Sequence, residues 1–238
     1  MLSVHNAASG EFVAHLDGDD VMLPGKLQVQ VDFLRAHARH VIVAHDMEII
    51  DGNSAPVGPN FGIGGEPPSA DLSELVTRGC YFAHSSKMYR RNAASIRERD
   101  RETVDFLFHI DQARHGLVGY LNQPLGRYRR TQSGLSSINS RFKQSVLQGH
   151  LDAYDFALAR GVPEAVVYPA KLNFRYVNAM GCLRANRADL FRQLRIPDGQ
   201  ERHWATLRQR LVLGLPARLA LVVARVFDRW SGRGIGDF

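Results

Sequence analysis

The chain contains few cysteines and few lysines, and it lacks a long uninterrupted apolar run. Its two cysteines, Cys80 and Cys182, form no CxxC pair in the 238 residues, which argues against a disulfide framework and a thiolate zinc site. The segment from Met1 to Gly10 has neither the basic start nor the apolar run of a secretion signal. These absences favour a reducing, cytoplasmic setting.

Arginine supplies almost all of the positive charge. Only four of the 30 basic residues are lysines, and the formal net charge is +6 with a sequence pI near 9.6. Such a charge suits a phosphate-bearing partner, a nucleic acid or an anionic membrane, although an ordinary solvated surface explains it at least as well. No interleaved aromatic platform or recognition motif supports the nucleic-acid alternative. With 45% hydrophobic residues, the chain can bury one sizeable core or two small ones.

An acidic loop follows the first apolar run. The residues from Glu11 to Leu16 are mostly apolar and stop at Asp17-Gly18-Asp19-Asp20, a pattern that predicts a strand ending in a loop. Three carboxylates so close together repel one another unless a cation or hydrogen bonds offset their charge, and hard oxygen ligands favour magnesium or manganese. A solvated turn is an equally good explanation of this tetrapeptide taken alone.

Turn signals divide the first 142 residues into strands and helices. An apolar stripe formed by Leu27, Val31 and Leu34 predicts a helix with Pro24 at its first position. A loop rich in glycine and proline is expected over 52–68. The other expected elements are strands at 41–44, 47–50 and 118–121 and helices at 72–78 and 103–115.

Beyond residue 142 the pattern changes to long apolar-periodic stretches without evident strands. We therefore expect a domain boundary there, with an α/β part at 1–142 and a helical region at 143–238. The stretch 211–230 is apolar, but Pro216, Arg218 and Arg225 interrupt it, which argues against a membrane-spanning helix. Peripheral docking on the inner face of a membrane through 211–230 stays open.

Several segments in order resemble family 2 glycosyltransferases. The run from Ala8 to Asp20 is similar to the strand and DxD segment of that family, and the stretch from Leu23 to Gly52 is similar to the family's next segment. The resemblance covers roughly residues 5 to 140, and several weak motifs in the right order are stronger than any one of them. The segments that match the acceptor-side half of the family are Met88–Arg91, Asp105 to Gly116, and Pro124–Arg130.

The resemblance implies a GT-A-type α/β fold, a partial mixed sheet of the nucleotide-diphospho-sugar transferase kind with a helical C-terminal region. It implies transfer of a sugar from a nucleotide-sugar donor to a glycan or lipid-linked acceptor, in bacterial polysaccharide or glycan biosynthesis. It places Asp17 near the nucleotide and makes Asp19 and Asp20 the ligands of manganese or magnesium and the contacts of the diphosphate. It makes Asp105 the base of an inverting displacement, and helix 103–115 can bring such a base from a separate element.

Two arginines near the end of the resembling part, Arg129 and Arg130, are expected to neutralise diphosphate charge, unless they are plain surface residues. The chain departs from the family pattern in two places: Val104 replaces an acid beside the base, and Arg130-Thr131-Gln132 replaces a segment that often carries histidine.

A larger departure concerns the front of the family's domain. The chain starts immediately before the DxD strand, so about two βαβ units, on the order of 60 residues, are expected to be missing. An exposed sheet edge would then favour self-association. The alternative to an active enzyme is a catalytically inactive glycosyltransferase fragment or pseudoenzyme that acts as a binding module.

Overall fold

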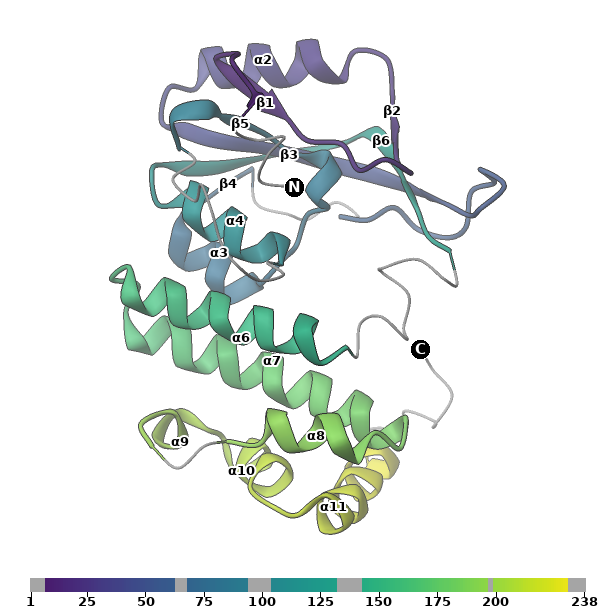
Figure 1. Cartoon of the computed structure of the whole chain (residues 1–238), viewed down its shortest axis with the longest axis vertical. Helices are drawn as coiled ribbons and strands as arrows, with labels where there is room; N and C mark the ends of the chain where they lie inside the picture. Colours follow the sequence, from purple (N-terminus) through teal and green to yellow (C-terminus); the bar gives the residue numbers. More distant parts are fainter. Residues whose placement is uncertain (1–6, 63–67, 94–103, 132–142, 197–198, 231–238) are drawn as a thin grey trace.

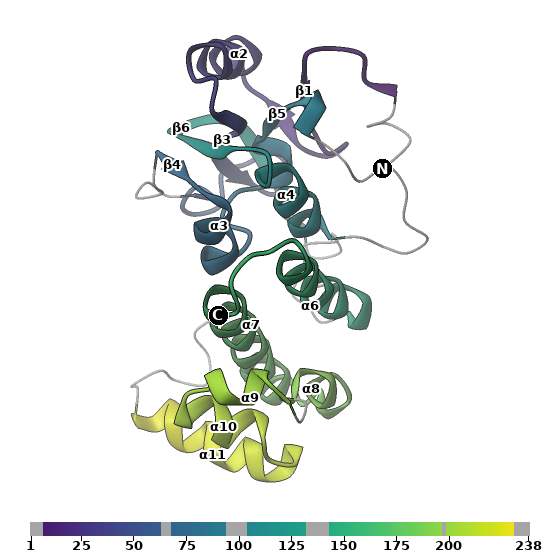
Figure 2. The same ribbon diagram turned by 90° about the vertical axis from the view of Figure 1, so that its left-hand side faces the viewer.

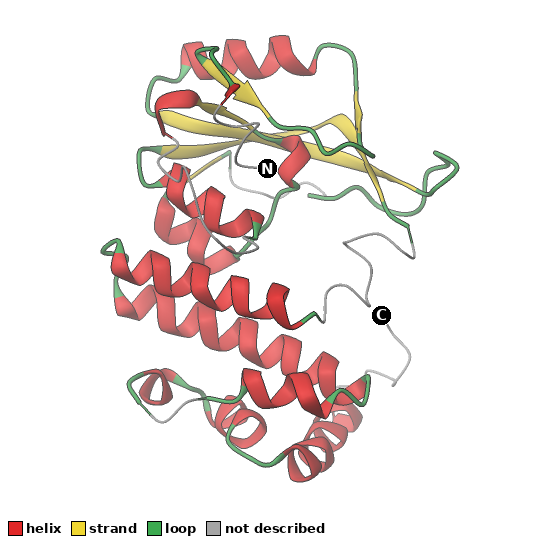
Figure 3. Cartoon of the chain, viewed as in Figure 1, coloured by secondary structure: helices red, strands yellow, loops and turns green. Residues whose placement is uncertain are grey.

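The computed structural model describes residues 7–62, 68–93, 104–131, 143–196 and 199–230. A mixed sheet lies between helix α2 (Lys26–Ala36) on one side and helices α3 (Leu72–Arg78) and α4 (Asp105–Ala113) on the other (Figures 1 and 3). The helices after residue 143 form the opposite end of the molecule. This arrangement agrees with the α/β class predicted from the sequence.

The sheet contains strands of very different lengths. They are β1 (Phe12–Ala14), β2 (Val21–Met22), β3 (His40–Ile50), β4 (Ser69–Ala70), β5 (Met88–Arg90) and β6 (Leu117–Arg129). The order is β1-β5-β3-β6-β2, with β4 also paired to β6. β3 and β6 pair in parallel, and the other pairings in the described residues are antiparallel. The long parallel pair therefore forms the centre of a mixed sheet.

Strand β3 is continuous, so the prediction of two separate strands at 41–44 and 47–50 was wrong. The register shifts at Asp46, because β6 places extra residues between Leu121 and Pro124 at that point. Since β6 takes up the irregularity, β3 passes its polar pair His45-Asp46 without a break. Strand β6 also runs well beyond the predicted 118–121. Pro124 lies at the irregularity, where a missing N–H is tolerated.

Helix α2 begins at Lys26, two residues after the predicted start at Pro24, and its inward face differs from the predicted stripe. Leu34 is buried as expected, whereas Leu27 is 45% exposed. Lys26 and Gln30, eight and four residues before Leu34, take the other inward positions. The Gln30 amide donates to two backbone carbonyls at 3.1 and 2.8 Å. Two polar side chains with internal partners therefore replace part of an apolar face.

The sequence predicted the bounds of α3 correctly and those of α4 approximately. Asp71 caps α3 by accepting a hydrogen bond from the Glu74 N–H at 2.8 Å, and the helix ends at Gly79, whose φ is 74°. Helix α4 is shorter than the predicted 103–115 and begins at Asp105. Residue 103 and part of the Gly/Pro-rich loop, 63–67, lie outside the described residues.

From residue 143 on, the described residues form helices and no strand, as the periodicity predicted. Tyr154 and Val167 in this region belong to the same apolar core as Leu75 of α3 and Phe106 of α4. A second core joins the helices at the far end, which Figure 2 shows from the side. The proposed boundary near 142 stays a prediction. The helices are α6 (Gln144–Ala159), α7 (Glu164–Arg184), α8 (Ala188–Leu194), α9 (Glu201–Trp204), α10 (Leu207–Leu213) and α11 (Ala217–Trp230).

Candidate functional site

The acidic loop, residues 17–20, connects β1 to β2 and lies beside the short 3-10 helix η1 (His84–Ser86). The Asp17 N–H donates to Ser85 Oγ at 2.9 Å, and the Ser85 hydroxyl donates back to Asp17 Oδ2 at 3.1 Å. His15 Nε2 lies 3.0 Å from the other carboxylate oxygen. The hydrogen bond with His15 lowers the pKa of Asp17, although burial opposes it. Asp17 is therefore an ionised carboxylate held in place by two side chains.

Asp20 is held through only one of its two carboxylate oxygens. Its Oδ1 accepts a hydrogen bond from the Arg129 N–H at 2.8 Å. Its Oδ2 is buried and has no hydrogen-bond partner among the residues that the structure describes. Burial raises the pKa of Asp20, against the opposing effects of Ser85 and the Arg129 N–H. A buried carboxylate oxygen without a partner is unusual, and a bound cation is one way to satisfy it.

Arg129 fastens the acidic loop to the turn after β3. Its Nε donates to the Asp19 carbonyl at 2.9 Å, and its Nη1 donates to the Asp51 carbonyl at 2.8 Å and to Ser54 Oγ at 3.1 Å. Arg130 is exposed, and its N–H donates to the Ile50 carbonyl at 2.8 Å. The contacts of Arg129 hold the loop in shape, and diphosphate binding by either arginine stays a prediction.

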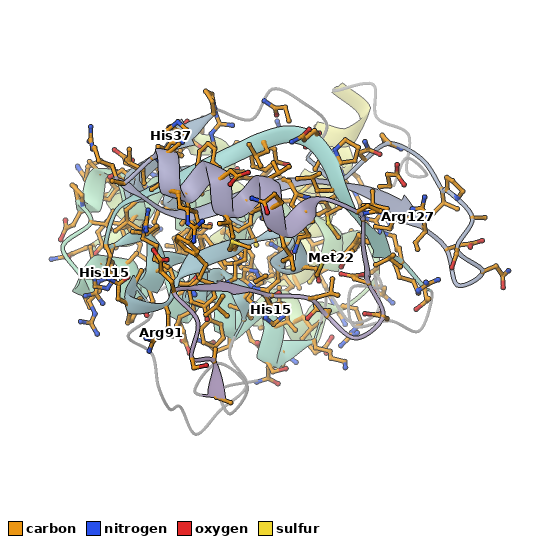
Figure 4. The ribbon with its side chains drawn as sticks, turned by 90° about the horizontal axis from the view of Figure 1, so that it is seen from above. His15, Met22, His37, Arg91, His115 and Arg127 are labelled. Carbon is orange, nitrogen blue, oxygen red and sulfur yellow. The ribbon has the colours of Figure 1, made fainter. Side chains whose placement is uncertain are left out.

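The acidic loop lies at the carboxyl end of the parallel strand pair. In Figure 4, Met22 and Arg127 lie toward one end of the sheet, while His37 and His115 lie at the other end, where β3 and β6 begin. The hydrogen bonds from Arg129, the last residue of β6, bring the loop to the end at which β6 finishes. Ligands of open α/β sheets bind at this end of parallel strands.

Asp105, the predicted base, is the first residue of α4 and faces the same site. Its side chain keeps 43% of its surface exposed, and its Oδ1 lies 3.8 Å from His84 Nδ1. Burial raises the pKa of Asp105, the Lys87 ammonium lowers it, and the Asp17 carboxylate raises it. Because the Asp17 charge raises the pKa of Asp105, the acidic loop and the start of α4 share one electrostatic environment.

Lys87 is a buried cation beneath these carboxylates, and sequence reasoning missed it. It is completely buried, and its Nζ donates to Gln112 Oε1 at 3.1 Å. Burial lowers the pKa of Lys87 to about 7, while the carboxylates of Asp105 and Asp17 oppose this shift. A signal was present, because Lys87 is one of only four lysines and directly precedes the Met88–Arg91 motif.

Two histidines, His84 and His109, lie on the inner side of Asp105, and sequence reasoning missed His84. His84 Nδ1 lies 3.1 Å from His109 Nε2, and His109 Nδ1 lies 3.6 Å from Cys80 Sγ. Burial lowers the pKa of His109 well below its usual range, so this ring is neutral. Asp105 and His109 lie four residues apart on one face of α4, and both contact His84. The rings of His84 and His109 therefore lie on the buried side of the Asp105 carboxylate.

The described residues include carboxylates near one another but no complete set of metal ligands. No group of three or more His, Cys, Asp or Glu side chains in the described ranges is placed to hold a metal ion. Asp19 is exposed, and Asp20 offers its one unsatisfied oxygen. A cation here would take at most two protein carboxylates and fill its remaining positions with diphosphate or water oxygens, as magnesium commonly does.

Comparison with known proteins points to one class. No protein-family model matches the chain. Part of the chain is similar to bacterial proteins named as glycosyltransferases, and its mixed sheet and helices are compatible with a fold of that kind.

Two such relatives define the extent of the similarity. EpsE of Bacillus subtilis (strain 168), which carries a provisional glycosyltransferase name, is 32% identical over 88 residues, 36% of this chain and 29% of EpsE. The protein alr2836 of Nostoc sp. (strain PCC 7120 / SAG 25.82 / UTEX 2576), named as an uncharacterized glycosyltransferase, is 31% identical over 139 residues, 55% of this chain and 39% of that relative. The chain thus spans well under half the length of either curated relative.

Proposed function

We propose that this chain is the acceptor-side part of a GT-A-type glycosyltransferase, which transfers a sugar from a nucleotide-diphosphate donor to a glycan or lipid-linked acceptor. The observation that carries the proposal is a series of contacts from the acidic loop to Asp105. His15 Nε2 lies 3.0 Å from Asp17, the ring centroids of His15 and His84 are 3.8 Å apart, and His84 Nδ1 lies 3.8 Å from Asp105 Oδ1. Such a transfer needs oxygen ligands near the diphosphate and a carboxylate on the acceptor side. The partial similarity to named glycosyltransferases supports the same class.

The acidic loop fits a divalent cation. Asp19 and Asp20 would hold manganese or magnesium, which when bound stabilises the negative charge on a leaving diphosphate. The unsatisfied Oδ2 of Asp20 supports this assignment. Asp17, ionised and held by Ser85, would keep its place next to the nucleotide without binding the metal.

Asp105 would accept the proton of the acceptor hydroxyl. A general base must be ionised before it acts, and the Lys87 ammonium favours that form of Asp105. The exposed part of the side chain gives an acceptor access to the carboxylate. His84, itself 3.1 Å from His109, lies 3.8 Å from the Asp105 carboxylate on its inner side, and the exposed outer side would be left for substrate.

The test is Asp105→Asn, which keeps the shape of the side chain and removes its basicity. We expect release of nucleoside diphosphate from a panel of nucleotide sugars, measured with manganese and the whole protein, to fall on the order of 10²-fold. Manganese affinity by calorimetry should not change, because Asp105 is not a proposed ligand.

Asp32→Asn is the matched control, since Asp32 is an aspartate on α2 whose carboxylate accepts a hydrogen bond from Gln28. It should leave release unchanged. If Asp105→Asn changes release by less than about threefold, the base lies elsewhere. If the unaltered protein binds manganese but releases no diphosphate from any donor, the binding-module alternative is favoured.

A further inference from the structure

Helix α11 exposes bulky apolar side chains along one face. Leu219, Val222 and Val226 are 56%, 58% and 48% exposed. Their spacing of three and four residues puts them on the same side of the helix. A surface helix of a water-soluble protein normally turns polar side chains outward.

The inward face of α11 is narrow. Ala220 and Ala224 are buried in the core that α11 shares with α7, α8 and α10, and Leu221 and Val223 are partly buried against it. The described residues leave Leu219, Val222 and Val226 on the opposite side largely uncovered. The apolar surface of α11 therefore extends beyond the surface that the helix buries against the rest of the fold.

Helix α10 continues the same kind of surface. Leu207 and Leu211, four residues apart on one face, are 74% and 39% exposed. Helices α10 and α11 pack on each other and lie at the end of the molecule farthest from α2 (Figures 1 and 2). We call the exposed side chains of Leu207, Leu211, Leu219, Val222 and Val226 the apolar strip.

The charges around the apolar strip indicate what covers it. Residues 202–227 include five arginines and no aspartate or glutamate. Arg218 and Arg225 are exposed on α11, and neither makes a hydrogen bond or ion pair with a described residue. One acid, Asp228, follows three residues after Arg225 on α11. Aliphatic side chains bordered by arginines that outnumber the acids match a bilayer with anionic headgroups, whereas protein interfaces favour aromatic anchors.

We propose that the apolar strip docks on an anionic lipid bilayer, with its aliphatic side chains in the headgroup boundary and Arg218 and Arg225 against lipid phosphates. No helix in the described part of the chain is long and apolar enough to cross a bilayer, so this contact is peripheral. The proposal does not depend on the proposed transferase activity. It would, however, bring the enzyme to the surface where a lipid-linked acceptor resides.

Sedimentation with vesicles tests the proposal on the whole chain. The protein should bind vesicles of phosphatidylcholine with phosphatidylglycerol at least about tenfold more tightly than vesicles of phosphatidylcholine alone. The double variant Leu219→Ser, Val222→Ser should lose at least about tenfold in affinity for the anionic vesicles. Arg218→Gln with Arg225→Gln should remove most of the preference for anionic lipid. Since all four side chains are exposed, far-UV circular dichroism should confirm that each variant is folded.

Leu27→Ser is the matched control, because Leu27 is exposed to a similar degree on α2 at the other end of the molecule. It should bind vesicles like the unaltered chain. Absence of vesicle binding, or an equal loss in Leu27→Ser, overturns the proposal. It is also overturned if the chain dimerises in solution, the serine variants dissociate the dimer, and vesicles are not bound, since the strip is then a contact between copies.

Discussion

At the residue scale, the chemistry of the site depends on a buried lysine. The Lys87 ammonium is cut off from water and donates a hydrogen bond to Gln112. Burial makes its charge costly, and the carboxylates of Asp17 and Asp105 offset part of that cost. The lysine and the two acids therefore set one another's protonation, and removing any of them changes the others.

Lys87→Met should reduce the pH dependence of stability between about pH 7 and pH 10.5, to which the buried Lys26, whose pKa burial lowers to about 8, also contributes. Burial lowers the pKa of Lys87 to about 7 from an ordinary 10.5, so between these values the unfolded chain holds a proton that the folded chain has lost. Stability of the unaltered protein should therefore rise with pH across this window, by up to about 1.4 kcal/mol per pH unit from this group. Urea unfolding at about pH 7 and about pH 9 measures the slope.

The exposed Lys143→Met serves as the control and should keep the slope of the unaltered protein. A slope that is the same in Lys87→Met and in the unaltered chain would show that Lys87 does not titrate in this range.

At the scale of elements, the acidic loop is held in shape by hydrogen bonds from two other elements. Arg129 bonds the loop by its backbone and by its guanidinium, and Ser85 bonds it from the opposite side. A loop held in this way loses little conformational freedom on binding a cation. Its one unsatisfied atom, Oδ2 of Asp20, is the expected point of contact.

Asp20→Asn should separate metal binding from stability. The amide oxygen can still accept the Arg129 N–H, while the charge that burial disfavours is gone. We expect the urea midpoint to stay the same or rise, and manganese affinity by calorimetry to fall at least about tenfold. The Asp32→Asn variant should change neither quantity. Unchanged manganese affinity in Asp20→Asn would mean that the loop is only a turn.

At the scale of the whole molecule, the helical region is packed directly against the element that carries the proposed base. Gly149 of α6 lies so close to Val104 that an added Cβ would come within 2.7 Å of Val104 Cγ1. Val104 immediately precedes Asp105 at the start of α4. The contact between the two parts of the chain therefore supports the site.

Gly149→Leu should push α6 away from α4. The extra side chain has no room, so we expect a loss of about 1–3 kcal/mol in the free energy of unfolding and a fall in diphosphate release, because Asp105 moves with Val104. Ser145→Leu is the control: it is one turn earlier on α6 and exposed, and it should be near neutral. Normal stability and release in Gly149→Leu would show that the two parts are not coupled here.

Part of the site was predictable and part was not. The positions of Asp17 to Asp20 after a strand and of Asp105 on a helix followed from the apolar run and from a family resemblance. Lys87, Ser85 and His84 were missed, since nothing near them in sequence shows that they meet the acidic loop. The bond from Asp17 to Ser85 joins residues 68 positions apart.

The sequence by itself determined the local features: the cap at Asp71, the end of α3 at Gly79, and the helices beyond residue 143. These depend on hydrogen bonds and apolar spacing within a few residues. Only the tertiary structure decided that β3 runs unbroken, that Lys26 and Gln30 face inward, and that Lys87 lies beneath two carboxylates. Each of these depends on the partner that distant strands and helices supply, because a polar group is buried only where the fold brings it a hydrogen bond or an opposite charge.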